Sequence, residues 1–285
     1  MYNLTIENEY GRSLTFNQVG GAYQITEIEG LSSPEADIHT TTTALYDGEK
    51  FNSAKTQMRT MNIAFAIDYS AEYYRLEAYK VLHVKKPVKI SYKTTMVDVY
   101  IEGIVQHFDV KHFEAKQIAT LTVVCPKPYW IEAQEMINEL SATLNKFHFP
   151  FASTEEPELV FGKYETKRSV SINNESSTEC GMTIELRALA GVTNPKVINY
   201  VTGEFIGINI SMQTADEIFI CTEEGNKTAY LLRSGVKTNL FNLVMEGSDW
   251  LQLDIGGNEF VYTVSGGNEE DLLVTFRHHG LREGV

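Results

Sequence analysis

The histidines and acids of the chain include the side chains that could bind a metal ion. One segment places two histidines close to two acids, namely His107, Asp109, His112 and Glu114. On a β-strand the first two face one side and the last two face the other, so the four do not converge on one ion. His278 and His279 are adjacent and would likewise point to opposite faces of a strand. We therefore expect no metal site.

The candidates for nucleophilic and acid–base catalysis are equally sparse. The chain has three cysteines, widely spaced and without a pair at redox or metal-ligand spacing: Cys125, Cys180 and Cys221. No serine lies in a Gly-x-Ser-x-Gly frame, which disfavours an esterase or protease. The 38 acidic residues could supply the facing carboxylates of a glycosidase by chance, so they do not single out a pair. We expect no catalytic residues and no cofactor, with a hydrolase as the least favoured alternative.

One tryptophan is the remaining candidate for contact with a ligand. Alternation places Trp250 with Gln252 on one face of a strand, and Leu251 with Leu253 on the other. An exposed tryptophan on a β-sandwich can stack on a sugar ring, which gives a carbohydrate-binding module as the alternative function. Tryptophan side chains more often pack in a core or between domains, and we prefer that interpretation for Trp250.

Composition limits the classes of fold and function. A chain of 285 residues with 43% hydrophobic content is long enough for two domains with cores. Fourteen Phe and fifteen Tyr, with abundant Thr, Ile and Val, favour sheets. The formal net charge of −14 disfavours binding to nucleic-acid phosphate. The sequence shows neither a signal peptide nor an apolar run long enough to span a membrane, so we expect folding in a cytoplasm and no membrane partner.

The sequence pattern of the first half of the chain predicts a sheet with one helix. Paired alternating runs begin it, and residues 30–44 are polar and threonine-rich, which predicts a long arm or loop. Residues 55–67 alternate over both faces and predict a central strand. Apolar side chains recur at helical spacing over residues 70–82, and Asp68 or Ser70 can cap this helix.

The second half reads as an all-β domain behind a linker. Prolines and aromatic residues crowd residues 126–157, which predicts the linker, with a short helix possible over residues 136–144. Short apolar runs then follow one another between Gly- and Asn-rich turns, the pattern of an antiparallel sandwich or jelly roll. We expect one domain over residues 1–150 and a second over residues 151–285.

Several short motifs occur in an order that resembles a known family. They are the Asp47-Gly48 turn, Arg59 at the start of the alternating strand, the helix, the Pro128-Tyr129-Trp130 step, Trp250 running into Gly256-Gly257-Asn258, and the closing Thr275-Phe276-Arg277 strand. This order resembles the distal tail proteins of long-tailed bacteriophages that infect Gram-positive hosts, a family found also in related tail-like particles.

The resemblance implies a structural, non-enzymatic protein of the virion tail. It implies an N-terminal tail-tube-like β-barrel, the belt domain, with one α-helix, followed by a C-terminal galectin-like antiparallel β-sandwich. Six copies would form a ring that joins the tail-tube protein to the tail-tip hub protein and carries receptor-binding proteins, while DNA passes through without specific binding. Asp47, Gly48 and Arg59 are the expected inter-subunit residues, and residues 30–51 the expected arm toward a neighbouring copy.

Overall fold

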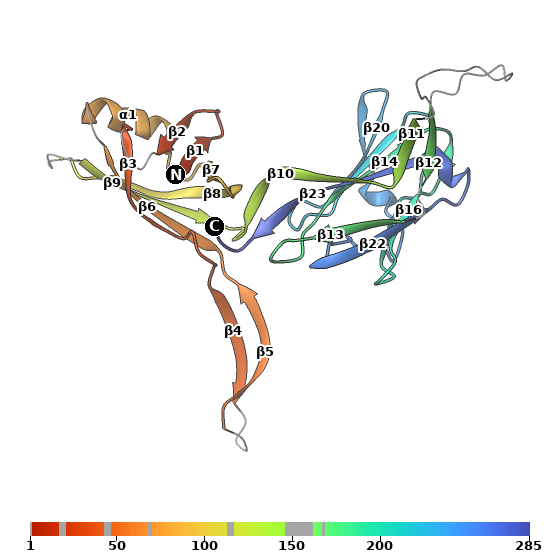
Figure 1. The fold of residues 1–285 in the computed structure, drawn as a ribbon, viewed down its shortest axis with the longest axis horizontal. Helices are drawn as coiled ribbons and strands as arrows, with labels where there is room; N and C mark the ends of the chain where they lie inside the picture. The colour runs from red at the N-terminus through yellow and green to blue at the C-terminus, as the bar shows by residue number, and fades with distance from the viewer. Residues whose placement is uncertain are drawn as a thin grey trace. The chain divides into compact units, whose positions relative to one another are not determined.

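The computed structural model describes residues 2–16, 21–42, 47–67, 70–112, 117–145, 162–166 and 169–285. These residues are mainly in antiparallel strands, with one α-helix among them (Figure 1), so the predicted fold class is confirmed. The chain divides into two compact units, Met1–Gln134 with Leu281–Val285, and Glu135–Gly280. The division falls within strand β10 (Trp130–Glu139) and within strand β23 (Leu272–Arg282), whereas the sequence-based boundary at residue 150 lies outside the described residues.

The first unit is a curled antiparallel sheet with strand order β2-β1-β7-β8-β9-β6-β3. Strands β2 and β3, at the two ends of this order, also lie against each other, which gives the sheet a barrel-like form. The strands are β1 Asn3–Asn8, β2 Ser13–Phe16, β3 Tyr23–Glu29, β6 Arg59–Ile67, β7 Pro87–Lys93, β8 Asp98–Val110 and β9 Gln117–Cys125. Strand β6 pairs on both edges, as the alternating run predicts.

Helix α1 (Ala71–Val81) packs on β2 and β6 and confirms the predicted helix. Tyr23 ties it to the sheet, because its hydroxyl donates to the carbonyl of Tyr74 at 2.8 Å. Phe16 and Phe65 meet edge to face beneath it, with ring centroids 4.9 Å apart. Ser70 occupies the N-cap position but makes no side-chain capping bond, and Asp68 lies outside the described residues.

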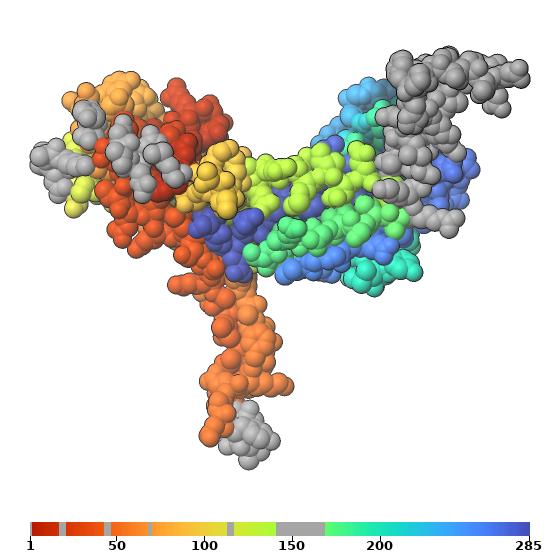
Figure 2. All heavy atoms as spheres, in the orientation of Figure 1, coloured from red at the N-terminus to blue at the C-terminus, as the bar shows by residue number. Residues whose placement is uncertain are grey.

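The stretch predicted as an arm or loop is a hairpin that forms a sheet of its own. Strand β4 (Ala36–Thr42) pairs only with β5 (Glu49–Thr56), with a bulge between His39 and Thr40. Every residue of β4 is exposed, and the hairpin projects from the first unit as a narrow extension (Figures 1 and 2). We call residues 36–56 the arm.

The second unit is an antiparallel sandwich, as predicted. One sheet has the order β23-β14-β19-β20-β21 and the other the order β13-β22-β16-β17. Between them Phe260 of β22 stacks on Phe276 of β23 at 5.0 Å, and both side chains are fully buried. The further strands are β13 Val170–Asn174, β14 Thr183–Ala188, β16 Lys196–Asn199, β17 Phe205–Gly207, β19 Glu217–Cys221, β20 Thr228–Arg233, β21 Val236–Asn239 and β22 Gly256–Thr263.

The smaller elements include one correction. Residues 136–144, for which a short helix is proposed from the sequence, lie in strands β10 and β11 (Ser141–Asn145), so that expectation is wrong. The physical reason is pairing: β10 lies between β8 and β23 in the hydrogen-bonded order, and β11 pairs with β12 (Gly162–Thr166). The remaining elements are β15 Val192–Thr193, β18 Ser211–Met212, and the 3-10 turns η1 Phe241–Leu243 and η2 Glu269–Asp271.

Candidate functional site

One face of the arm carries four apolar side chains beside polar ones, and we call it the apolar face; the other face is polar. Paired residues of an antiparallel ladder share a face, so the register assigns the side chains directly. The apolar face carries Ala36, Ile38, Phe51 and Ala54, with Thr56 at the root and Thr40, Thr42 and Glu49 toward the tip, and the polar face carries Asp37, His39, Thr41, Lys50, Ser53 and Lys55. Ile38 is 65% exposed and Phe51 is 61% exposed. The apolar face therefore has no core of its own.

The bonds that hold the arm together are local and exposed to solvent. Thr40 and Thr42 both donate to the carboxylate of Glu49, and the side-chain amide of Asn52 donates to the hydroxyl of Thr41 at 2.5 Å. A two-stranded hairpin is marginally stable in water without further packing. Burying a large apolar side chain contributes about 1.5–3 kcal/mol, so covering Ile38 and Phe51 would stabilise the arm substantially.

The tip of the arm includes two of the predicted inter-subunit residues. Asp47 and Gly48 are exposed and lie directly before β5, which begins at Glu49. Gly48 has φ +90, and a Cβ added there would meet no atom within 4 Å. The two residues are accessible to a neighbouring chain, and their inter-subunit role stays a prediction.

Arg59, the third predicted inter-subunit residue, lies inside its own unit. It is only 3% exposed, and its guanidinium donates to backbone carbonyls from three parts of the chain. Nε donates to Pro128 at 2.7 Å, one terminal nitrogen donates to Gly30 and Ser32, and the other donates to Glu283. The guanidinium is therefore bonded within its own unit, and an inter-subunit role of Arg59 stays a prediction.

The surroundings of Arg59 explain how the root of the arm is held. Gly30, which it bonds, has φ +91, and a Cβ there would lie 2.6 Å from the carbonyl oxygen of Thr60. The guanidinium also lies over the ring of Trp130, 5.8 Å from its centroid, and Trp130 is fully buried. Burial lowers the pKa of Arg59, although an arginine remains charged at any physiological pH. Arg59 thus joins both ends of the arm's root to the core of the first unit.

The histidine and acid cluster does not form a site in the described structure. Among the residues that the structure describes, no three His, Cys, Asp or Glu side chains are placed to hold a metal ion, and Glu114 lies outside them. His107 sits at a bulge of β8 and pairs with Thr122. His278 is buried in β23.

The cysteines are free in the structure and two of them are buried. Burial raises the pKa of the Cys125 thiol to about 11, and it raises the pKa of the Cys180 thiol to about 11 as well. A thiol with such a pKa is protonated at neutral pH and is a poor nucleophile. The Arg59 guanidinium acts on the Cys125 pKa in the opposite direction, but burial has the larger effect, so neither thiol has the lowered pKa of a catalytic cysteine.

Trp250 lies in the second unit, outside the regular strands. Its neighbours follow the predicted alternation, because Leu251 and Leu253 are buried while Gln252 is only partly covered. Trp250 is partly exposed and stacks on Phe241, with ring centroids 5.5 Å apart and the planes 28° from parallel. The structure therefore places it at the surface of the sandwich with one ring face covered.

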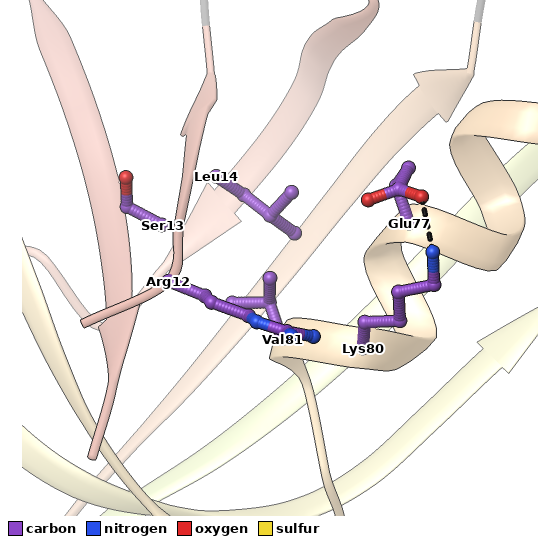
Figure 3. A pocket seen from close by; sticks show the side chains of 6 residues that line it. All are labelled: Arg12, Ser13, Leu14, Glu77, Lys80 and Val81. Atoms are coloured by element: carbon purple, nitrogen blue, oxygen red, sulfur yellow. Dashed lines mark hydrogen bonds and ion pairs between the residues drawn. The ribbon is translucent and has the colours of Figure 1, made fainter. Parts of the chain in front are cut away.

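A small depression lies between β2 and the C-terminal end of α1 (Figure 3). Its lining residues are Arg12, Ser13, Leu14, Glu77, Lys80 and Val81, and the charges of Glu77 and Lys80 are paired at 2.5 Å. An ion pair within one helix turn is an ordinary surface feature. The depression brings together no nucleophile, base and orienting group of the kind that catalysis requires. No described helix has the length and apolar character needed to cross a membrane.

Comparison with solved structures shows which class of proteins shares this fold. The chain has the fold of bacteriophage tail-hub and baseplate proteins. Among these, the Dit protein of phage SPP1, described as a paradigm of the hub adsorption apparatus in phages that infect Gram-positive hosts, matches with a TM-score of 0.69. The two chains are 13% identical, and the match covers 97% of this chain and 98% of that one.

Two structures of the phage P2 baseplate in its activated conformation, one with Ca and one with Sr, match with TM-scores of 0.54. Identities are 11% and 10%, and 98% of each chain is covered. No protein-family model and no curated protein sequence matches the chain. Identities this low establish a shared fold over the full length, and function has to be argued from surfaces.

Sequence reasoning missed the residues that make the arm a candidate interaction surface. Ile38 and Phe51 are isolated apolar residues within polar runs, so neither run shows the period of a buried strand. The available signal is that the two fall on one face once the strands are paired. That pairing depends on a β-bulge, and the sequence pattern does not indicate the position of the bulge.

Proposed function

We propose that the protein is a structural component of a phage tail tip, whose copies associate through the arm into a ring. The observation that carries this proposal is the arm itself, a hairpin with an exposed apolar face on a Dit-like fold. Among the described residues of one chain nothing covers Ile38 and Phe51, whereas a second copy supplies a partner in every subunit. The protein acts as a scaffold and has no catalytic role.

The finer features of the proposal follow the resemblance. Six copies form the ring, the first unit serves as the belt domain, and the second is a galectin-like lobe facing outward. The ring joins the tail-tube protein to the tail-tip hub and carries receptor-binding proteins in the virion tail. A net charge of −14 per copy is compatible with passage of DNA without specific binding.

The proposal is tested by the mass of the assembled protein. Native mass spectrometry and negative-stain microscopy of the full chain should show closed rings of six. A variant in which a short Gly-Ser linker replaces residues 36–56 should keep its circular dichroism spectrum, because the arm forms a separate sheet, but should be monomeric. A protein that stays monomeric at every concentration, or an armless variant that still forms rings, would refute the proposed role of the arm.

A second candidate is carbohydrate binding by the second unit. The observation in its favour is that Trp250 is not buried in the sandwich core and lies beside Phe241, which is 50% exposed. Binding of the full chain to a glycan array, abolished by Trp250→Ala and unchanged by Val236→Ala at another exposed site, would support it. Equal binding by both variants and the parent would count against it.

A further inference from the structure

Residues 281–285, which we call the strap, follow the second unit in the chain but belong to the first unit. The backbone N–H of Val285 donates to the carbonyl of Leu31 at 3.1 Å, and Val285 packs against the hydrophobic core of the first unit. Gly284 lies against the same segment, because a Cβ added there would lie 3.3 Å from the backbone nitrogen of Ser33. The strap therefore contacts residues 31–33, and Figure 1 shows the end of the chain near the root of the arm.

The strap is bonded to the chain on both sides of the arm. The segment that it contacts leads into the arm, and Arg59, which follows the arm, donates to the backbone carbonyl of Glu283 in the strap. The root itself is closed by one bond from the backbone N–H of Gln57 to the carbonyl of Glu35, at 2.8 Å. Strand β4 pairs only with β5, so the contacts at the root determine the direction in which the arm projects.

The strap is held more weakly than the strand from which it continues. Leu272, Val274 and Phe276 of β23 are fully buried, whereas every residue of the strap is exposed or only partly covered. Arg282 pairs with Glu132 at 2.6 Å, but both side chains are in contact with solvent, and such a pair contributes little. Segments that bury little apolar surface open locally at low cost, so the strap can detach while the cores of both units stay folded.

We infer that the strap is a conformational device that fixes the direction of the arm relative to the first unit, and that its detachment frees the arm. A fixed arm loses less conformational freedom when it meets a neighbouring copy, so an attached strap strengthens association. This consequence for association rests on the proposed ring. The control of the arm by the strap is a property of the single chain and does not depend on the ring.

Single-molecule fluorescence energy transfer within one chain tests this control. In a Cys221→Ser background, which removes the one native thiol that is not buried, dyes are attached at Ser53→Cys on the arm and Glu7→Cys on β1, both at exposed positions. Measurement at picomolar concentration excludes contacts with other copies. The labelled full-length chain should give one narrow distribution of transfer efficiency. Ending the chain at Gly280, which removes the strap, should widen that distribution at least twofold.

Two point variants separate the contacts of the strap from its mere presence. Val285→Pro deletes the N–H that bonds Leu31 and keeps an apolar side chain, so it should also widen the distribution. Glu283→Gln is the matched control, because its exposed side chain is changed while the carbonyl that Arg59 bonds is retained. It should give the distribution of the full-length chain. Circular dichroism and the fluorescence of the buried Trp130 check that each variant is folded.

The outcomes separate this inference from the proposed function. A distribution as narrow as that of the full-length chain in Val285→Pro would overturn the inference, and this variant decides the matter if the shortened chain fails to fold. In mass photometry dilution series Val285→Pro should associate at least tenfold more weakly than Glu283→Gln, and equal association would overturn the contribution of the strap to assembly. A full-length chain that forms no oligomer at any concentration would refute the ring, whereas the single-chain measurement would still test the strap.

Discussion

Removing the guanidinium of Arg59 should destabilise the first unit and release the root of the arm. The perturbation is Arg59→Met, which keeps a long apolar side chain and deletes every donor. Four carbonyls, those of Gly30, Ser32, Pro128 and Glu283, then lose a charged hydrogen-bond partner at a buried position. Each such bond contributes about 1.5–3 kcal/mol by itself. The contributions are not additive because one guanidinium serves all four carbonyls, so we expect a loss of about 3 kcal/mol, the upper end for a single such bond.

The assay uses the two tryptophans, one of which lies in each unit. Trp130 is buried beside Arg59, whereas Trp250 belongs to the second unit, so Trp250→Phe leaves a fluorescence signal from the first unit alone. Urea unfolding followed by this signal gives the free energy of unfolding that Arg59 affects. Arg12→Met, at an exposed position of the same unit, is the matched control and should change stability by less than about 0.5 kcal/mol.

The result that would refute this reasoning is a loss below about 1 kcal/mol for Arg59→Met. Such a value would mean that the carbonyls find water or other donors once the guanidinium is gone. Arg59→Lys should fall between the parent and Arg59→Met, because an ammonium keeps the charge but does not reproduce the planar arrangement of donors. Equal stability of the Lys variant and the parent would show that charge, and not geometry, holds the root.

Three further predictions concern the rest of the chain. Hydrogen bonds from Arg233 hold the pKa of Asp216 below its ordinary 3.8. The stabilising effect of the Asp216 carboxylate is therefore present above that pH and is lost as the pH falls through the lowered pKa. Asp216→Asn should lower the free energy of unfolding at pH 7, and the difference between variant and parent should narrow toward pH 2 in urea titrations followed by Trp250 fluorescence. Gly181→Ala should destabilise the second unit by at least about 1–3 kcal/mol in the same assay, because its Cβ would lie 2.4 Å from a backbone atom, whereas Gly257→Ala meets no neighbour and should be nearly neutral. In the native protein, maleimide should label Cys221 before either buried thiol, and equal labelling of all three would contradict the assigned burial.

Local patterns were sufficient for much of the secondary structure. Alternation over residues 55–67 predicts the central strand because successive side chains of a strand point to opposite faces, and this gives a period of two in the sequence. Strand β6 pairs on both edges, as expected. Spacing over residues 70–82 predicts α1 for the same kind of reason, because one face packs on the sheet. The polar run over residues 30–44 predicts an arm because it lacks any core pattern, and β4 is fully exposed.

Local patterns fail where distant segments decide the outcome. Residues 136–144 have helical spacing, yet they lie in strands because β10 and β11 find partners far along the chain. The boundary between the two units at Gln134 has no signal in the composition of the sequence, because the boundary falls within a strand. The side chain of Arg59 is an equally clear case, because one of its partners lies 224 positions away.

The sequence by itself determined the class of the fold, the presence and position of one helix, the exposed arm, and the scarcity of residues that could carry chemistry. These properties follow from composition and from periods of two or 3.6 residues, which act within one element. Only the tertiary structure decided that Arg59 is buried and that Ile38 and Phe51 share one face of the arm. It also placed Trp250 at the surface of the sandwich beside Phe241. Burial and shared faces depend on strand register and on which distant segments pack together, and no local pattern contains that information.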